Sequence, residues 1–196
     1  AFDGVAARIS ELARTWRDAP MLAKTHGQPA TPTTFGKELA VFSGRLSRVR
    51  DRIVQAPYLA KFSGATGTFS AHIVAEPGTN WPIVSKNFVE GLGLTWNPLT
   101  TQIESHDGAA ELFTAISHAN RILHNLATDV WTYISLSYLT QIPEPGATGS
   151  STMPHKINPI RFENAEANLE ISSSLLDGLA ATLVTSRLQR DLPDSS

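Results

Sequence analysis

Three long stretches of the chain carry apolar side chains at the spacing of an α-helix. They run from about Thr34 to Gln55, from about Asp107 to Leu139 and from about Pro159 to Val184. Apolar positions that recur at steps of three, four or seven residues form the buried face of a helix. These stretches exceed the usual helix length of about 11 to 12 residues. We therefore expect an all-α fold, an elongated bundle of long helices that packs against other chains. The apolar positions are Phe35, Leu39, Phe42, Leu46, Val49 and Ile53, then Leu112, Ile116, Leu123, Leu126, Val130 and Ile134, then Leu169, Leu176, Leu179 and Leu183.

Shorter patterns occupy the remaining sequence. Residues Phe2 to Asp18 predict a first amphipathic helix, and Trp81 to Glu90 predict a short helix whose Val84 and Phe88 face inward. No segment shows the alternation of a β-strand convincingly, and no internal repeat is visible. Polar loops are therefore expected between the helices.

The composition excludes several classes of protein. Hydrophobic residues make up 41% of the chain and charged residues 17%, which allows a buried core. A net charge of −2 does not predict general binding to nucleic acid or to membranes. The absence of cysteine rules out disulfides and thiolate chemistry, and it fits a cytoplasmic protein. No apolar run approaches the roughly 18 residues that are needed to cross a bilayer.

The segment from Gly149 to Pro159 carries the densest set of reactive groups, and it reads Gly-Ser-Ser-Thr-Met-Pro-His-Lys-Ile-Asn-Pro. Its Gly-Ser-Ser start, which taken alone is more often a solvated loop, exposes backbone N–H groups and can bend close to a ligand. Lys156 adds a positive charge and Asn158 an oriented donor. A helix that begins near Pro159 points the positive end of its dipole at the same place. The segment predicts a site for a small anion that also contains a nucleophile or base.

The whole segment resembles the signature loop of the fumarase/aspartase superfamily, whose members eliminate fumarate from succinyl-type substrates. Residues Thr25 to Thr31 resemble the second common segment of that superfamily. The run from Met153 to Lys156 is similar to the adenylosuccinate lyase family, as are Thr100 to Asp107 and Ser186 to Asp191. Argininosuccinate lyases usually carry Gln, and fumarases Gly, at the position of His155. The likeness extends along nearly the whole chain.

The resemblance implies that residues 1–196 are the central helical-bundle domain of such an enzyme, without the family's N-terminal and C-terminal domains. The implied reaction is the release of fumarate from adenylosuccinate, and from the related succinyl-carboxamide ribotide, in purine nucleotide biosynthesis. The resemblance implies no cofactor and no metal. It also implies a nucleotide as the small-molecule substrate and a homotetramer whose composite active sites draw loops from three subunits, with no nucleic acid polymer and no membrane as partner. An isolated piece of this extent is expected to be inactive.

The resemblance also assigns the two proton transfers, with Ser150 as the base and His26 as the acid toward the leaving nitrogen. A serine hydroxyl needs nearby positive charge and N–H donors to act as a base, and Lys156 is a candidate for that role. A histidine with an unperturbed pKa of about 6.5 suits proton transfer near neutrality. Spacing alone does not separate Ser150 from Ser151. The implied substrate-binding residues are Thr25, Gln102, Ser151, Met153, Lys156, Asn158, Arg187, Arg190 and Ser195.

Other interpretations of the whole chain remain open. It could be another fumarate-releasing lyase of the superfamily, such as an argininosuccinate lyase, or a cycloisomerase, although His155 and the Gln102 region speak against both. It could also be a non-catalytic oligomerisation bundle. The presence of Ser150, His26 and Lys156 speaks against that alternative.

Some individual residues keep two interpretations. Arg187 and Arg190 either bind a phosphate or carboxylate, which suits the fork of a guanidinium, or form a structural ion pair. His106 either caps a helix or contacts the ligand. No role is assigned to His72, His118 or His124.

Overall fold

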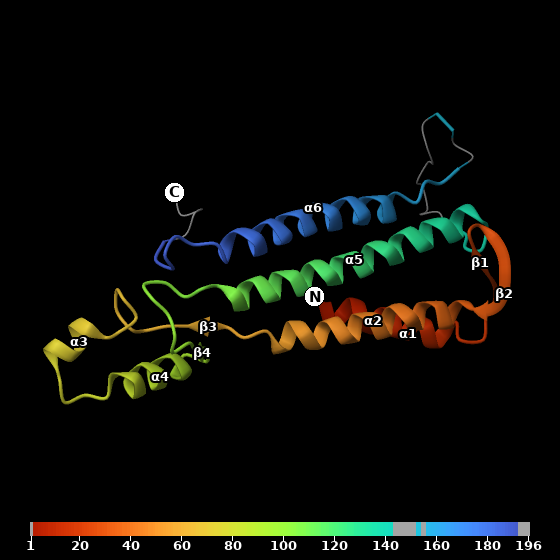
Figure 1. Ribbon diagram of the computed structural model, residues 1–196. Coiled ribbons are helices and arrows are strands. Elements are labelled where there is room, and N and C mark those ends of the chain that lie inside the picture. Colours follow the sequence, from red (N-terminus) through yellow and green to blue (C-terminus); the bar gives the residue numbers. More distant parts are fainter. Residues whose placement is uncertain (1, 143–151, 154–155, 192–196) are drawn as a thin grey trace. The chain divides into compact units, whose positions relative to one another are not determined.

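The computed structural model describes residues 2–142, 152–153 and 156–191, and most of these residues are helical (Figure 1). The predicted all-α class is confirmed, with only short strands between the helices. No helix in these ranges is long and apolar enough to span a membrane. The helices are α1 (Phe2–Thr15), α2 (Phe35–Gln55), α3 (Ser70–Ala75), α4 (Trp81–Gly91), α5 (Asp107–Ser135) and α6 (Ile160–Leu183). The strands are β1 (Pro20–Thr25), β2 (Gln28–Thr34), β3 (Leu59–Ala60) and β4 (Thr95–Trp96).

The chain divides into two compact units. The first unit consists of Ala1–Asp51 and His118–Ser173, and the second of Arg52–Ser117 and Ser174–Ser196. The segments singled out in the sequence are divided between the two units. Residues 25–31, the His26 segment, belong to the first unit, and residues 100–106, the Gln102 segment, belong to the second.

In the first unit, α1 and α2 approach each other closely at a glycine. A Cβ atom added to Gly36 would lie 2.3 Å from the Ala13 carbonyl oxygen and 2.5 Å from the Arg17 backbone. The amide of Gly36 donates to the Trp16 carbonyl over 2.9 Å, and the Phe35 amide donates to the Ala19 carbonyl over 3.0 Å. Only a residue without a side chain allows the start of α2 to approach the end of α1 this closely.

The core of the first unit follows the stripe predicted for α2. Leu39, Phe42, Leu46 and Val49 are all buried, with Leu46 and Val49 at 0% and 2% exposure. On α5 the buried side chains of this unit are Ile122 and two small residues, Ala119 and Ala127. The predicted apolar residues Leu123, Leu126, Val130 and Ile134 are only half-buried. Small residues at the contact allow the helices to pack closely, while the larger side chains beside them keep part of their surface exposed.

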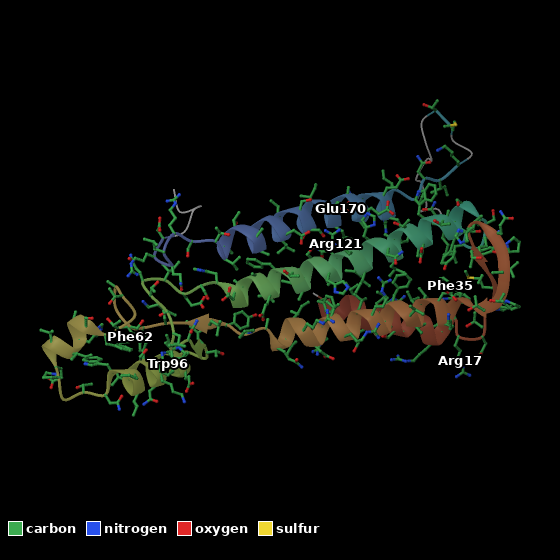
Figure 2. All side chains as sticks on the ribbon, viewed as in Figure 1. Arg17, Phe35, Phe62, Trp96, Arg121 and Glu170 are labelled. Carbon is green, nitrogen blue, oxygen red and sulfur yellow. The ribbon has the colours of Figure 1, made fainter. Side chains whose placement is uncertain are left out.

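Polar side chains line the contact between α5 and the first part of α6. Figure 2 labels Arg121 on α5 and Glu170 on α6, the two helices that these contacts join. The imidazole of His124 lies 3.7 Å from the Glu170 carboxylate. The hydrogen bonds across this contact run from Asn120 Nδ2 to Ser172 Oγ (2.9 Å), from Thr128 Oγ1 to Glu166 Oε1 (2.6 Å) and from Trp131 Nε1 to Glu163 Oε1 (3.1 Å).

The expectation that the chain lacks strands was wrong for the segment between α1 and α2. Strands β1 and β2 pair antiparallel, from Pro20 opposite Thr34 to Thr25 opposite Gln28. Most side chains of this hairpin are exposed on both faces, so no apolar alternation marks it in the sequence. Its two-residue turn, described below, was the available signal.

In the second unit, α4 has the predicted bounds but a different buried face. Val84 and Phe88 are 40% and 57% exposed, whereas Ser85 and Val89 are 0% and 2% exposed, so the predicted inward pair was wrong. The Ser85 hydroxyl donates to the Phe62 carbonyl, which allows a polar residue to occupy the buried position.

Two further features of the second unit are a short pair of parallel strands and a partly exposed leucine stripe on α6. Strand β3 pairs parallel with β4, with Leu59 opposite Thr95 and Ala60 opposite Trp96. On the part of α6 that belongs to this unit, Leu176 and Leu183 are half-buried but Leu179 is 43% exposed. The leucine stripe of α6 is therefore not fully covered within this chain.

Candidate active site

The hairpin turn between β1 and β2 presents His26. His26 and Gly27 have positive φ angles of 52° and 72°, and Thr25 pairs with Gln28 on either side of them. Two consecutive left-handed residues make the tight turn whose twist suits a β-hairpin. Glycine adopts this conformation freely, and histidine is one of the few other residues enriched there. Both turn residues are exposed, so the imidazole is accessible at the tip of the hairpin.

The end of α5 contacts the middle of strand β1 in this hairpin. Ser137 adopts a left-handed conformation, with φ 61°. The Tyr138 amide donates to the Tyr133 carbonyl over 2.8 Å, and the Ser137 amide donates to the Ile134 carbonyl over 3.0 Å, which is the Schellman pattern of a helix C-terminus. This cap explains why α5 ends at Ser135 and not near Leu139 as predicted.

The same cap directs the Tyr138 side chain toward β1. The ring of Tyr138 stacks on that of Tyr133, with centroids 6.2 Å apart, and Tyr133 meets Phe35 edge to face at 6.1 Å. The Tyr138 hydroxyl donates to the Leu22 carbonyl over 3.0 Å. Leu22 lies where the register between β1 and β2 shifts, so the added hydrogen bond supports an irregular point of the hairpin.

An acidic cavity of about 430 Å³ lies between the hairpin and the end of α5. Burial raises the pKa of the Asp129 carboxyl above its usual value, and the negative charge of Glu38 adds to the shift. Burial, together with the charges of Asp129 and Glu38, raises the pKa of Tyr133 to about 12. Tyr133 therefore stays protonated near neutral pH. The lining residues are Met21, Leu22, Ala23, Lys24, Gly27, Glu38, Asp129, Thr132, Tyr133, Leu136 and Tyr138.

The segment before α6 is described only in part. Ser150, Ser151 and His155 lie outside the described residues, as does Ser195 near the end of the chain. The Lys156 ammonium donates to the Asn158 side-chain oxygen, so the predicted positive charge and the predicted carboxamide lie side by side.

Two contacts connect this segment to the helices around it. The Gln141 side chain donates to the Ile157 carbonyl over 2.8 Å and joins the segment to the chain that follows α5. The amides of Phe162 and Glu163 donate to the Pro159 carbonyl, so α6 begins where the sequence predicted it. Its positive end therefore follows directly after Lys156 and Asn158.

In the second unit, Gln102 lies in a segment without regular secondary structure. The Lys61 ammonium donates to the carbonyl oxygens of Thr101 and Gln102 over 2.8 and 2.9 Å. The Thr101 hydroxyl donates to the Gln189 carbonyl. The Gln102 segment and the segment from Ser186 to Asp191 therefore contact each other.

Arg187 and Arg190 stand at the two ends of a tight turn. Leu188 and Gln189 between them have positive φ angles of 54° and 56°, and the Arg190 amide donates to the Arg187 carbonyl over 3.1 Å. The Arg187 guanidinium forms an ion pair with Asp191 at 3.0 Å. Arg187 therefore forms the structural ion pair that was the alternative to binding a phosphate or carboxylate. Both partners remain largely exposed, and such a pair contributes little to stability.

The candidate residues fall into two groups. Thr25, His26, Met153, Lys156 and Asn158 belong to the first unit, and Gln102, Arg187 and Arg190 belong to the second. No hydrogen bond or ion pair between described residues joins His26 to Lys156 or Asn158. Within the second unit, a hydrogen bond joins the Gln102 segment to the turn from Arg187 to Arg190, called the arginine turn below.

Two further histidines, His72 and His106, have structural surroundings in the second unit. His72 packs among the rings of Phe62, Phe69 and Trp81, and its Nδ1 is buried without a hydrogen-bond partner. His106 immediately precedes α5, where its carbonyl accepts from the Ala110 amide and its own amide donates to Glu104 over 2.7 Å. His106 therefore precedes the helix through its backbone, whereas its side-chain Nδ1 is buried without a hydrogen-bond partner.

Groups of acidic residues and histidines able to hold a metal ion do not occur among the described residues. The candidate residues themselves carry hydroxyls, amides, ammonium and guanidinium groups and an imidazole, and such groups bind anions and transfer protons.

A comparison with protein families finds a match between residues 3–170 and a family model described as lyase. The chain belongs to this lyase family. The match covers α1 to α5 and the first part of α6, and so includes the His26 turn, the Gln102 segment and the Lys156 segment.

Curated proteins similar to this member of the lyase family are adenylosuccinate lyases. The protein of that name from Escherichia coli K12 is 50% identical over 188 residues, and the one from Dictyostelium discoideum is 49% identical over 191 residues. Both alignments cover 96% of this chain. The chain spans 41% of the length of each of these relatives.

Solved structures show the same fold at lower sequence identity. A 3-carboxy-cis,cis-muconate lactonizing enzyme from Pseudomonas putida aligns over 98% of this chain and 41% of its own, with a TM-score of 0.71 and 25% identity. A fumarate lyase from Mesorhizobium sp. BNC1 aligns over 97% of this chain, with a TM-score of 0.70 and 24% identity, which is evidence for the fold alone.

The sequence analysis missed two side chains that hold these segments of the lyase fold in place. Lys61 bonds the Gln102 segment and Tyr138 bonds the His26 hairpin. Lys61 lies two residues before a Gly-rich loop from Ser63 to Thr68, which is a weak signal. Tyr138 stands at a helix end that the apolar pattern alone did not locate.

Proposed function

We propose that the complete natural protein is an adenylosuccinate lyase of the cytoplasm, which releases fumarate by breaking a carbon–nitrogen bond. The observation that carries this proposal is the 50% identity to the Escherichia coli protein of that name over 96% of the chain. Because the chain spans 41% of that relative, the activity is assigned to the complete protein and not to residues 1–196 alone.

The reaction requires two proton transfers. A base removes a proton from the carbon beta to the nitrogen, and the electrons of that C–H bond form the double bond of fumarate. The C–N bond breaks, and the nitrogen keeps its electron pair and takes a proton from an acid. The C–H bond is weakly acidic, so the carboxylate beside it has to be stabilised while negative charge develops.

His26 is the acid in this proposal. Its exposed position at the tip of a tight turn allows the imidazole to reach a substrate bound beside the hairpin. The hydrogen bond from Tyr138 to Leu22, in the middle of β1, supports that position. An imidazole can deliver a proton near neutral pH because its ordinary pKa lies close to neutrality.

Ser150 is the base. The support for this role is its place in the segment that resembles the superfamily's signature, six residues before Lys156. The Lys156 ammonium and the N-terminus of α6 supply positive potential at this segment, which favours the alkoxide of a nearby serine and the developing negative charge of the substrate.

Residues of each group are assigned to substrate binding in the complete protein. Gln102, Arg187 and Arg190 are assigned to the nucleotide part, since a guanidinium suits a phosphate. Arg190 is exposed, and Arg187 can exchange its exposed partner Asp191 for a phosphate at little cost. The remaining assignments are Thr25, Ser151, Met153, Lys156, Asn158 and Ser195.

The complete protein is proposed to be a homotetramer whose active sites combine residues from several subunits. Large apolar side chains on α6 support this, because Ile160, Ile171 and Leu175 are 67%, 62% and 64% exposed in the single chain. Apolar surface of this kind along a long helix usually marks an interface.

A substrate comparison tests the proposed specificity. The complete protein is assayed with adenylosuccinate and with argininosuccinate, and only adenylosuccinate is expected to give fumarate. Arg187→Ala should raise the KM for adenylosuccinate because a phosphate contact is lost. Turnover of argininosuccinate, or an Arg187→Ala variant whose KM rises for argininosuccinate alone, would show that the protein is a different fumarate-releasing lyase.

A further inference from the structure

Lys61 makes an unusually complete set of contacts for a lysine near the surface. Its ammonium donates to the carbonyl oxygens of Gly64, Thr101 and Gln102 at 2.7, 2.8 and 2.9 Å. An ammonium group has three N–H donors, so all three are used. The acceptors are backbone atoms of two segments that lie far apart in the sequence, one in the loop from Ser63 to Thr68 and one at Thr101 and Gln102.

The two segments are also packed directly against each other. The Ser63 and Thr100 hydroxyls are 3.3 Å apart. A Cβ atom added to Gly67 would lie 1.8 Å from the Thr100 carbonyl oxygen, and the φ angle of Gly67 is 74°. The Gly-rich loop thus forms a surface on which the Gln102 segment rests, and only glycine allows the contact.

The Gln102 segment has no regular secondary structure to keep its shape. It forms no helix and no strand, so the ladder of backbone hydrogen bonds that fixes regular structure is missing there. Two consecutive carbonyls of this segment accept from one ammonium instead. Removing the donor would leave three acceptors to be satisfied by water and would free the segment to move.

The segment that Lys61 holds in place also contacts the arginine turn. The Thr101 hydroxyl donates to the Gln189 carbonyl, within the turn that has Arg187 and Arg190 at its ends. A chain of contacts therefore runs from Lys61 through Thr101 to this turn, and all of it lies within the second unit.

We propose that Lys61 is a positioning residue for substrate binding, which holds Gln102 in place directly and the Arg187 to Arg190 turn through Thr101. The inference rests on the proposed function, because it takes Gln102 and the two arginines as substrate contacts. Lys61 itself does not contact the substrate, since its three donors are occupied by the protein.

Hydrogen–deuterium exchange of the complete natural protein, without substrate, tests the positioning step. Lys61→Met keeps a long apolar side chain but removes the charge and the donors. Exchange should become faster in peptides that cover residues 100–104 and 186–190, and stay unchanged in α4. Lys86→Met is the matched control, because Lys86 lies in the same unit and only approaches Glu90 at 4.0 Å on an exposed helix face. Unchanged exchange at both segments, or equally faster exchange throughout the unit, would overturn the proposal.

Steady-state kinetics test the consequence for the substrate. Loss of contacts to the non-reacting part of a substrate weakens ground state and transition state alike, so Lys61→Met should raise the KM for adenylosuccinate about tenfold and change kcat less than about threefold. Lys61→Arg, which keeps the charge, should recover part of the loss. A lysine that only stabilises the fold would lower the melting temperature and leave KM unchanged, and that result would overturn the proposal. If the wild-type protein does not act on adenylosuccinate at all, the proposed function fails, while the exchange experiment still decides whether Lys61 positions the two segments.

Discussion

The Tyr138 hydroxyl donates a hydrogen bond of 3.0 Å to the Leu22 carbonyl oxygen and so ties the end of α5 to the hairpin that carries His26. The helix cap at Ser137 and the stacked ring of Tyr133 hold the tyrosine in place, so the hydrogen bond has a defined geometry. The position of His26 therefore depends on a residue more than a hundred positions away in the sequence.

Tyr138→Phe tests this relationship, since it keeps the stacked ring and removes only the hydroxyl. The Leu22 carbonyl loses its donor, so the free energy of unfolding should fall by about 0.5–1.5 kcal/mol in chemical denaturation. In the complete protein kcat should fall more than KM rises, because a displaced acid affects the transition state more than binding. Tyr58→Phe, at a 58% exposed residue, serves as the control and should change neither quantity. A Tyr138→Phe protein with unaltered stability would show that the hydrogen bond does not hold the hairpin.

His26→Gln tests the acid. Glutamine keeps a hydrogen-bonding side chain but cannot deliver a proton near neutral pH, so the rate should fall by about 100-fold or more, the usual scale of general acid catalysis. The measurement is the pH dependence of kcat. The variant should lose the limb of the profile that reports the acid, and a profile identical in shape and height to that of the wild type would remove His26 from this role.

Asp129 makes stability depend on pH. Its pKa in the folded protein is raised above the ordinary value of 3.8, so the folded state binds this proton more tightly than the unfolded state does. The stability that this group contributes is present below the ordinary pKa and is lost as the pH rises through the folded pKa. Asp129→Asn should therefore be more stable than the wild type at neutral pH, and the difference should shrink on acidification toward about pH 4. Thermal unfolding at several pH values measures it, and a variant less stable than the wild type at neutral pH would contradict the argument.

Two glycines of α2 should respond in opposite directions. Gly36→Ala places a methyl group against the backbone of α1 and should destabilise the protein by about 1–3 kcal/mol, the usual cost of overpacking. Gly44→Ala meets only the end of Arg48, at 3.7 Å, and should stabilise the helix by up to about 1 kcal/mol. Urea denaturation of both variants measures the change in the free energy of unfolding. Equal effects of the two substitutions would contradict the close approach of α1 and α2 at Gly36.

The sequence predicted the long helices well because their apolar periodicity extends over many turns. The stripe from Leu39 to Val49 is buried as expected. It predicted α4 less well, since Val84–Phe88 and Ser85–Val89 are adjacent rows of one helix. The hydrogen bond from Ser85 to the Phe62 carbonyl, which allows the polar row to be buried, is not visible in the sequence. The β1–β2 hairpin was missed because its side chains are mostly exposed on both faces.

The candidate site was visible in the sequence as separate segments, but not the contacts between them. The bond from Thr101 to Gln189 joins residues 88 positions apart, and that from Tyr138 to Leu22 joins residues 116 positions apart. Such pairs depend on how helices pack, which residue spacing along the chain does not encode. Local motifs in the sequence therefore indicated the chemistry. The residues that hold these motifs in place could be identified only from the structure.

Release of fumarate from adenylosuccinate, followed by ultraviolet absorbance, tests the proposed function most directly. The complete natural protein should produce fumarate, and its Ser150→Ala variant should still bind adenylosuccinate but produce fumarate at least about 100-fold more slowly, because the base is lost while the binding groups remain. Ser151→Ala is the matched control and should retain most of the activity. A wild-type protein that releases no fumarate, or a Ser150→Ala variant that works at nearly the wild-type rate, would contradict the account.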